Sequence, residues 1–551
     1  MAILIAANLP ILYCPLVSST LAVLGKTVPF LSQGQTGQYL ALSHRWGDPD
    51  SQGKKLVTTK GNIDDHHRGV PIEDFPLTFR HALEVARYLG IRYIWIDSLC
   101  IIQDDEEDWR AESAKMGDIY EKAYATLFAE RAANSDDGLV QTDEDLCVAE
   151  AKIPKFQFQH SGQDYEILLS TKLSTYPKSL EAAFCLVDHA PSHLQSRGWV
   201  VQEEILSRRK ICFSSTELHW HCNQIIRCEC GLIVHISEYD IQREGIMGNL
   251  AGRLLYEILP SDKVTKRLST HGFRPSAFGF GKPWRKLVEA YTRRKLTFEE
   301  DRLMALAGIV SQVTKQRATS DSRYLSGIWL EHAISQLLWS SDFNEGTLPC
   351  HRQRCRYAPT FSWASATGSV AFYAGLRTAG MVASATIVSG GSELLVNNDA
   401  QPRDWIRIRG KALQVVAYGR KVRSHIESAQ ARWESSDYTY QSRVDGVYKV
   451  GFRVQSCDQV DEKVVTSLQL LRLDTPEDWE FFREKGKRRL LYLVVLCPMD
   501  QFGTGMAGLL LREVEGHDGH YERVCRVATS NAKCKWDRVR QYAVDTEIVL
   551  V

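Results

Sequence analysis

Two adjacent glutamates, Glu203 and Glu204, stand in the otherwise apolar stretch GWVVQEEIL, shortly after Trp199. If VVQEEIL is helical, Trp199 and Glu203 share one face, whereas Glu204 lies about 100° further round the helix. A carboxylate that looks into a cleft can stabilise a developing positive charge or hold hydroxyl groups. Glu203 is therefore the candidate for chemistry, and a solvated helix face is the alternative for the pair.

Three arginines near Glu203 offer a purely structural alternative. Arg197, Arg208 and Arg209 all lie within six residues of it, so an ion pair with one of them would explain the carboxylate equally well. For Trp199 the alternative is packing in the core, where most large aromatic side chains are found. The sequence alone leaves both alternatives open.

Two further groups of polar residues follow segments that have the pattern of buried strands. The run YLALS, 39–43, ends in Ser43, His44, Arg45 and Trp46, and the run IRYIWID, 91–97, delivers Asp97 and Ser98. In parallel α/β sheets ligands bind at the carboxyl ends of the strands, so we expect these groups to converge on one site. Asp97 as a turn cap and Arg45 as a surface or ion-pairing residue are the alternatives.

The elements that would position these residues alternate between strand and helix. FPLTFRHALEVARYLG carries a helical apolar face between Pro76 and Gly90, and a second helix is predicted over 105–123, with the acidic run DDEEDW as its first turn. A third strand is predicted at ATLFA, 125–129. This alternation predicts an α/β fold with a doubly wound, mostly parallel sheet.

The rest of the chain changes character twice. The pattern is helical from 233 to 355, as in WRKLVEAYTRRKLTFEEDRLMALAGIVSQV and YLSGIWLEHAISQLLW. From 356 to 551 it consists of strands, among them TFSWASATG, WIRIRGKALQVVAYG, GVYKVGFRVQ, RLLYLVVLC, GLLLREV and EIVLV, which predicts an antiparallel sandwich or barrel. We therefore expect three domains, over 1–232, 233–355 and 356–551.

The composition excludes some classes of partner. Lys+Arg equals Asp+Glu at 67 each, so no basic excess indicates a nucleic acid. The 14 cysteines are scattered without a C-x-x-C pair, which favours reduced thiols and a cytoplasmic protein. The first 25 residues are uncharged, but they lack a basic start and are interrupted by Pro10 and Pro15, so neither a signal peptide nor a membrane span is expected.

Two other stretches are weaker candidates for a functional site. Cys100 follows Asp97 and Ser98, but no neighbouring signature supplies a base, and a buried thiol is its commoner fate. The stretch HWHCNQIIRCEC offers metal ligands at a spacing that is not a standard zinc knuckle, so no metal is predicted; the residues are His219, His221, Cys222, Cys228 and Cys230.

The motifs together resemble a known family. YLALSHRWGD, FPLTFRHALEVARYLGIRYIWIDSLCIIQDDEEDW, ESAKMGDIYEKAYATLFA and LQSRGWVVQEEILSRRKICF closely resemble the heterokaryon-incompatibility (HET) domain of filamentous fungi. The likeness is dense from about 39 to 222. Two departures are HWHC, where the family usually has YWEC, and Arg45, where a Cys or a small apolar residue is more usual. The resemblance implies a role in growth arrest or cell death on non-self recognition.

The HET resemblance also implies a distant kinship with Toll/interleukin-receptor (TIR) domains, several of which cleave NAD. SRGWVVQE is similar to their S-x-W-C-x-x-E segment, whose Glu is catalytic and stands four residues after a Trp. By this likeness Glu203 would be catalytic, NAD would be a substrate rather than a cofactor, and the bound nucleotide would contact the strand-end residues with Arg197 and Trp199.

Three functions stay open at the level of sequence. The first is a TIR-like NAD glycohydrolase with Glu203 catalytic. The second is a non-catalytic signalling module that self-assembles as a homo-oligomer or binds a protein partner. The third is a HET-derived enzyme of small-molecule metabolism, since one scaffold carries many functions.

Overall fold

Two compact units make up the chain, and each is described by itself. The first comprises Met1–Arg274, Arg294–Leu296 and Met304–Val313, and the second comprises Pro275–Arg293, Thr297–Leu303 and Thr314–Val551. The computed structural model describes residues 20–23, 28–31, 37–47, 56–140, 155–160, 163–168, 192–215, 218–222, 225–228, 233–235, 281–316, 323–341, 358–372, 381–393, 403–421, 448–454, 465–466, 488–498, 506–529 and 543–551.

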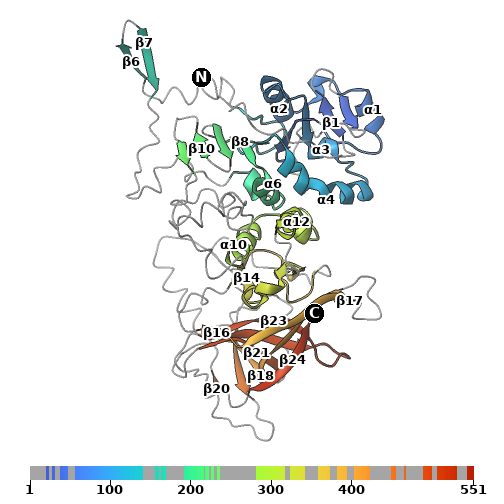
Figure 1. The fold of residues 1–551 in the computed structure, drawn as a ribbon, viewed down its shortest axis with the longest axis vertical. Helices are drawn as coiled ribbons and strands as arrows, with labels where there is room; N and C mark the ends of the chain where they lie inside the picture. The colour runs from blue at the N-terminus through green and yellow to red at the C-terminus, as the bar shows by residue number, and fades with distance from the viewer. Residues whose placement is uncertain are drawn as a thin grey trace. The chain divides into compact units, whose positions relative to one another are not determined.

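A mixed sheet forms the centre of the first unit (Figure 1). Its four central strands run parallel in the order β4-β3-β5-β8, where β3 is Tyr39–Ser43, β4 Tyr93–Ile96, β5 Ala125–Phe128 and β8 Arg209–Phe213. Antiparallel strands extend both edges: β1 (Thr20–Val23) and β2 (Val28–Leu31) beyond β4, and β9 (Leu218–Cys222), β10 (Ile225–Cys228) and β11 (Ile233–His235) beyond β8.

The predicted alternation of strands and helices is confirmed for the centre of this sheet, but "mostly parallel" is wrong for the sheet as a whole. The connections that follow β8, β9 and β10 are only a few residues long. Parallel neighbours need a long crossover, so such short connections permit only antiparallel pairs. The sequence patterns of β9 to β11 carry no sign of this difference.

Helices cover both faces of the parallel strands. Helix α2 (Leu77–Tyr88) buries Phe79, Ala82, Leu83 and Ala86 against alternate strand residues such as Leu42 and Ile96, as its apolar periodicity predicts. Helix α4 (Glu106–Lys122) lies on the other face, where Tyr120 packs on Trp95 and the Tyr39 hydroxyl donates to the Ile119 carbonyl at 2.6 Å. The side chain of Asp105 caps α4 by accepting from the backbone N–H groups of Glu107 and Asp108, so the acidic run is a helix start.

Short elements complete the described part of the first unit. They are α1 (Ile63–Arg68), η1 (Ile72–Asp74), α3 (Asp97–Cys100), η4 (Leu194–Ser196), α6 (Val200–Leu206) and the hairpin of β6 (Lys155–His160) with β7 (Gln163–Leu168). Helix α12 (Ala307–Gln316) belongs to this unit as far as Val313.

The second unit begins with helices and small hairpins. It contains α10 (Gly281–Tyr291), most of α11 (Asp301–Met304), β12 (Tyr324–Leu325), β13 (Ile328–Trp329), η5 (Leu330–His332), α13 (Ala333–Gln336), β14 (Trp339–Ser341), η6 (Trp363–Ser365) and β15 (Val370–Phe372).

Two sequence predictions fail in this part. YLSGIW is a β-hairpin rather than helix, because Ser326 and Gly327 both have positive φ, 40° and 95°, as a two-residue hairpin turn requires. TFSWASATG is not a strand, because the Ser362 side chain accepts from the Ala364 N–H and closes a 3-10 turn.

A barrel closes the second unit, drawn from orange to red in Figure 1. Strands β18 (Arg403–Lys421), β21 (Arg488–Pro498), β22 (Met506–Glu513), β23 (His520–Thr529) and β24 (Val544–Leu550) pair in a ring, with only the β23–β24 pair parallel. Strands β16 (Met381–Ala383), β17 (Ala385–Glu393), β19 (Tyr448–Val454) and β20 (Val465–Thr466) extend it. Of the predicted alternatives the structure therefore has the barrel.

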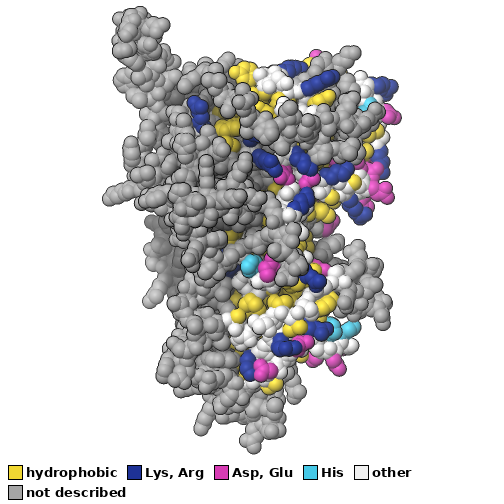
Figure 2. Space-filling model, viewed as in Figure 1, with side chains coloured by type: hydrophobic (Ala, Val, Ile, Leu, Met, Phe, Trp, Pro, Cys, Tyr) yellow, Lys and Arg dark blue, Asp and Glu magenta, His cyan; other side chains and the backbone are white. Residues whose placement is uncertain are grey.

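Charge and hydropathy agree with the neutral composition. On the face drawn in Figure 2, basic and acidic side chains of the described residues are intermingled rather than gathered by sign. Within the described ranges, no helix is both long and apolar enough to cross a bilayer.

Candidate functional site

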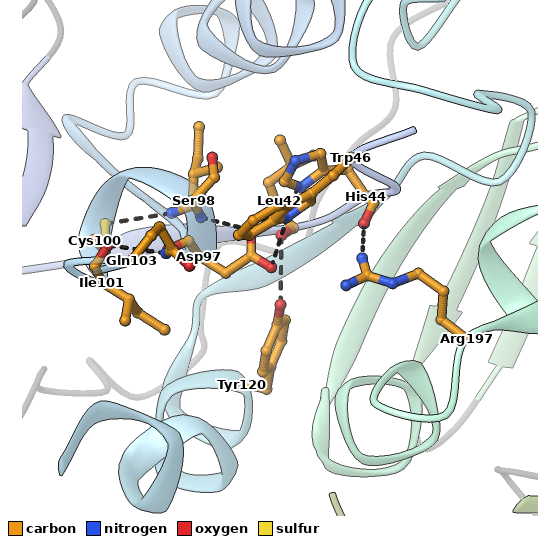
Figure 3. A network of polar contacts seen from close by, with 11 residues as sticks. Leu42, His44, Trp46, Asp97, Ser98, Cys100, Ile101, Gln103, Tyr120 and Arg197 are labelled. Atoms are coloured by element: carbon orange, nitrogen blue, oxygen red, sulfur yellow. Dashed lines mark hydrogen bonds and ion pairs between the residues drawn. The ribbon is translucent and has the colours of Figure 1, made fainter. Parts of the chain in front are cut away.

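The carboxyl ends of β3 and β4 lie side by side in the first unit. Leu42 pairs with Ile96, so the chain leaves the two strands at Ser43 and Asp97 as neighbours. The Asp97 carboxylate accepts from the Ser98 backbone N–H at 2.8 Å, and both of its oxygens accept from the Trp46 indole N–H at 3.1 Å (Figure 3). The residues that follow β3 and those that follow β4 therefore converge as expected, and the contact between Trp46 and Asp97 links the two groups.

His44 is buried between these strand ends and helix α2. Its ring packs edge-to-face on Phe79, with the ring centres 4.9 Å apart, and its Nδ1 lies 3.6 Å from an Asp97 oxygen, beyond hydrogen-bond length. Burial lowers the pKa of His44 from 6.5 to about 4, with Asp97 opposing this shift and Arg197 adding to it. His44 is consequently a neutral imidazole at physiological pH.

Glu203 reaches the same edge from helix α6 and is only 2% exposed. Burial raises the pKa of its carboxyl from 4.5 to about 7, although the Arg197 charge, the Ser43 hydroxyl and Tyr120 each lower it. The Ser43 hydroxyl is close enough to favour the charged carboxylate, yet its position does not satisfy hydrogen-bond geometry. Glu203 is therefore a buried carboxyl poised between its neutral and charged forms at neutral pH.

Glu204 lies in a different environment. Its carboxylate forms an ion pair with Arg294 at 3.0 Å. The arginines that offered a structural partner for Glu203 are engaged elsewhere, since Arg208 pairs with Glu121 and Arg209 donates to the Tyr124 carbonyl. Among the described residues, no arginine lies within ion-pair distance of Glu203.

Arg197 and Trp199 frame α6 at its start. The Arg197 guanidinium donates to the His44 carbonyl (Figure 3). Its backbone is held by Lys295, which exchanges hydrogen bonds of 2.7 Å with Ser196 and Gly198. Trp199 packs edge-to-face with Trp109 with ring centres 6.2 Å apart, so aromatic packing occupies part of its ring. Arg45 follows at the end of β3 and is partly buried.

Several buried polar atoms at this edge have no hydrogen-bond partner among the described residues. They are Ser43 Oγ, both ring nitrogens of His44, Ser98 Oγ and Glu203 Oε2. Native interiors satisfy most buried polar atoms, and each unsatisfied one costs about 1–3 kcal/mol. A cluster of them is expected where a ligand completes the hydrogen bonding.

The strand order places this cluster where open α/β sheets bind ligands. The chain continues from β3 to β4 on one side and reaches β5 on the other, so the order reverses at β3. Ligands of doubly wound sheets bind outside the carboxyl ends of the strands at such a reversal.

Two residues near the site were not among the sequence candidates. Tyr120, on helix α4, is close enough to interact with Glu203. Glu130 follows β5, and burial raises the pKa of its carboxyl to about 7. The position of Glu130 directly after a predicted strand was the available signal.

The weaker kinds of site gain no support. Burial raises the pKa of the Cys100 thiol well above its usual range, so this cysteine is a poor nucleophile. His219 and His221 stack edge-to-face on β9. No three His, Cys, Asp or Glu side chains within the described part are placed to hold a metal, and Cys230 lies outside it.

The first unit is thus an α/β domain with a buried polar cluster at the carboxyl edge of its parallel strands. Residues 39–203 match the family model described as "Heterokaryon incompatibility protein (HET)", so the chain carries a HET domain. A 94-residue segment is 31% identical to "Heterokaryon incompatibility protein 6, OR allele" of Neurospora crassa, covering 16% of this chain and 14% of that protein. The chain thus spans only a small part of this relative. No solved structure matches.

Proposed function

We propose that this chain is a HET-domain protein of non-self recognition whose first unit cleaves the N-glycosidic bond of NAD, with Glu203 as the catalytic residue. One observation carries the proposal: Glu203 is buried, has an oxygen without a partner, and lies among other unpartnered polar atoms at the carboxyl edge of parallel strands. The name of the Neurospora crassa relative supports the recognition role. We also propose that the protein acts in the cytoplasm as a homo-oligomer.

The order of the parallel strands supports this reaction class. The four parallel strands, taken in chain order, lie second-first-third-fourth across the sheet. That is the order of the first four strands in flavodoxin-like sheets, which bind a nucleotide at the reversal point. The segment SRGWVVQE then supplies the Trp and Glu that the TIR likeness requires.

In the proposed reaction the bond between ribose C1′ and the nicotinamide nitrogen breaks, and its electron pair leaves with nicotinamide. The ribose becomes oxocarbenium-like, which a nearby carboxylate stabilises. Water then adds to C1′ and gives its proton to Glu203, which yields ADP-ribose. The positive pyridinium of bound NAD lowers the pKa of Glu203 below about 7 and so favours the carboxylate.

The other candidate residues have positioning roles in this proposal. Asp97 and Ser98 hold the ribose, with Ser43 and His44 beside them. Arg197 and Arg45 bind the pyrophosphate, a task that suits guanidinium groups. The ring of Trp46 or Trp199 stacks on a base.

The direct test compares wild type, Glu203→Gln and Glu204→Gln, each full length. Nicotinamide release from NAD is followed by chromatography, with and without a crosslinker that enforces assembly. We expect wild type and Glu204→Gln to release nicotinamide and Glu203→Gln to lose at least 100-fold, as removal of a key electrostatic group does. Equal silence of all three under every condition would rule out the glycohydrolase.

One observation opposes the glycohydrolase and favours the alternative, a non-catalytic signalling module. His44, Ser98 and Glu203 are each only 2% exposed, so no substrate reaches them in this conformation. Expression of Glu203→Gln in fungal cells separates the two functions. Unchanged cell death with that variant would support assembly alone.

A further inference from the structure

The contact between Trp46 and Asp97 has an unusual geometry for a carboxylate. A single indole N–H is shared between both oxygens at 3.1 Å each. Hydrogen bonds from an N–H to a charged carboxylate are usually shorter, and a carboxylate can accept about four of them. Among the described residues, the other donor to the Asp97 carboxylate is the Ser98 backbone N–H, at 2.8 Å. His44 Nδ1 lies 3.6 Å from an Asp97 oxygen, beyond hydrogen-bond length. The carboxylate is therefore held but not saturated.

A pair of adjacent hydroxyl groups would fit this carboxylate better than one indole N–H. Each hydroxyl donates its one proton to one oxygen and can accept a hydrogen bond on its other side. Ser98 Oγ and the His44 ring nitrogens are buried and lack partners, and His44 Nδ1 lies 3.6 Å from an Asp97 oxygen (Figure 3). We therefore expect Ser98 Oγ and one His44 nitrogen to donate those second hydrogen bonds. A neutral His44 offers one N–H donor for this purpose.

Trp46 contacts the Asp97 carboxylate directly, so a ligand that binds both Asp97 oxygens has to displace its N–H. Trp46 is partly buried and is followed by Gly47, whose φ of 96° is available to glycine at low cost. The neighbouring backbone is fixed, because the Arg197 guanidinium holds the His44 carbonyl. We therefore expect the chain at Trp46 and Gly47 to be able to rearrange while the His44 carbonyl stays held.

We propose that Asp97 is the anchor for a vicinal diol, the hydroxyl pair of a ribose, and that the Trp46 indole occupies this anchor until the ligand displaces it. This proposal deepens the nucleotide site argued above and rests on it. Trp46 thus competes with the ligand for Asp97, and the ligand would also reach the neighbouring polar atoms that are buried yet unpartnered.

Binding of carba-NAD, whose glycosidic bond cannot break, tests the proposal by isothermal calorimetry on the full-length chain. Trp46→Phe keeps an aromatic face but removes the N–H donor, so we expect carba-NAD to bind about tenfold more tightly, the equivalent of one charge-assisted hydrogen bond. Asp97→Asn should bind at least tenfold more weakly. Trp220→Phe on β9 is the matched control and should leave Kd unchanged.

A ligand-side comparison keeps the test decisive if Asp97→Asn does not fold. Carba-NAD that lacks the two ring hydroxyls beside nicotinamide should bind wild type and Trp46→Phe equally weakly. Unchanged or weaker binding by Trp46→Phe, or no loss on removing the hydroxyls, overturns the proposal, as does absence of binding to both proteins. If NAD is cleaved but Trp46→Phe does not bind more tightly, only this proposal fails. If carba-NAD shows the expected pattern but NAD stays intact, only the glycohydrolase fails.

Discussion

Replacing Glu203 by Gln should change how the stability of the protein depends on pH. The pKa of the Glu203 carboxyl is raised from 4.5 to about 7, mainly by burial. That difference of about 2.5, at about 1.36 kcal/mol per pKa unit, corresponds to roughly 3 kcal/mol. The contribution is fully present below pH 4.5 and is lost as pH rises to about 7, because the unfolded chain ionises first. Glutamine fits the neutral form and does not ionise.

His44 complicates the wild-type curve in the opposite direction. Burial lowers its pKa from 6.5 to about 4, so its contribution is present above pH 6.5 and is lost as pH falls to about 4. The two effects offset each other between pH 4.5 and 6.5. The difference between wild type and Glu203→Gln cancels the His44 contribution and isolates that of Glu203.

Urea unfolding of both proteins at pH values from 4 to 8 measures this difference. We expect Glu203→Gln to gain about 3 kcal/mol relative to wild type between pH 4.5 and 7.5. Glu204 lies on the same helix as Glu203, and its replacement by Gln removes the ion pair with Arg294. Glu204→Gln should show no such gain. If the difference in free energy of unfolding between Glu203→Gln and wild type does not change with pH, the Glu203 carboxyl ionises in the folded protein as it does in water. If wild type instead becomes more stable relative to Glu203→Gln as pH rises, Glu203 is a structural carboxylate paired with an arginine.

Three further substitutions or truncations test the packing around the site and the hairpin. Gly308→Ala places a methyl group 2.6 Å from Gln202 Oε1, so we expect a loss of about 1–3 kcal/mol in urea unfolding. A chain that ends at residue 232 lacks this partner of Gln202 and should show reduced helix content by circular dichroism, because segments beyond 232 belong to the first unit. In Gly327→Ala the added methyl group would lie 2.5 Å from Trp363 Nε1, at a position whose φ is positive. We expect the melting temperature of this variant to fall, and an unchanged value would contradict the hairpin turn.

The local pattern of the first unit could be predicted from sequence wherever one face of an element is apolar. Helix α2 and strand β3 follow directly from their buried residues, and Asp105 caps α4 as the acidic run suggests. The antiparallel edges could not be predicted in the same way, because a buried parallel strand and a buried antiparallel strand carry similar residues. The hairpin at Ser326 and Gly327 was predictable from its Ser-Gly turn, but the apolar residues on either side also fit a helix.

The sequence predicts which residues form the candidate site but not which of them contact one another. The rule that strand ends converge places Ser43, His44 and Asp97 together, and the geometry agrees. The contact of Trp46 with Asp97 depends on a turn of the chain after β3 that no periodicity describes. Long-range contacts such as that of Gln202 with Gly308, 106 residues away, also have no local signal.

The energetics of the site support the proposal that it binds a ligand. Unsatisfied buried polar atoms cost about 1–3 kcal/mol each, and several are gathered at one edge of the sheet, whereas whole domains are stable by only about 5–15 kcal/mol. Glu204, one residue further along the same helix, is paired with Arg294 and carries no such cost. The difference between these two adjacent glutamates therefore comes from the direction in which α6 points them. We infer that a bound ligand supplies the partner that Glu203 Oε2 lacks.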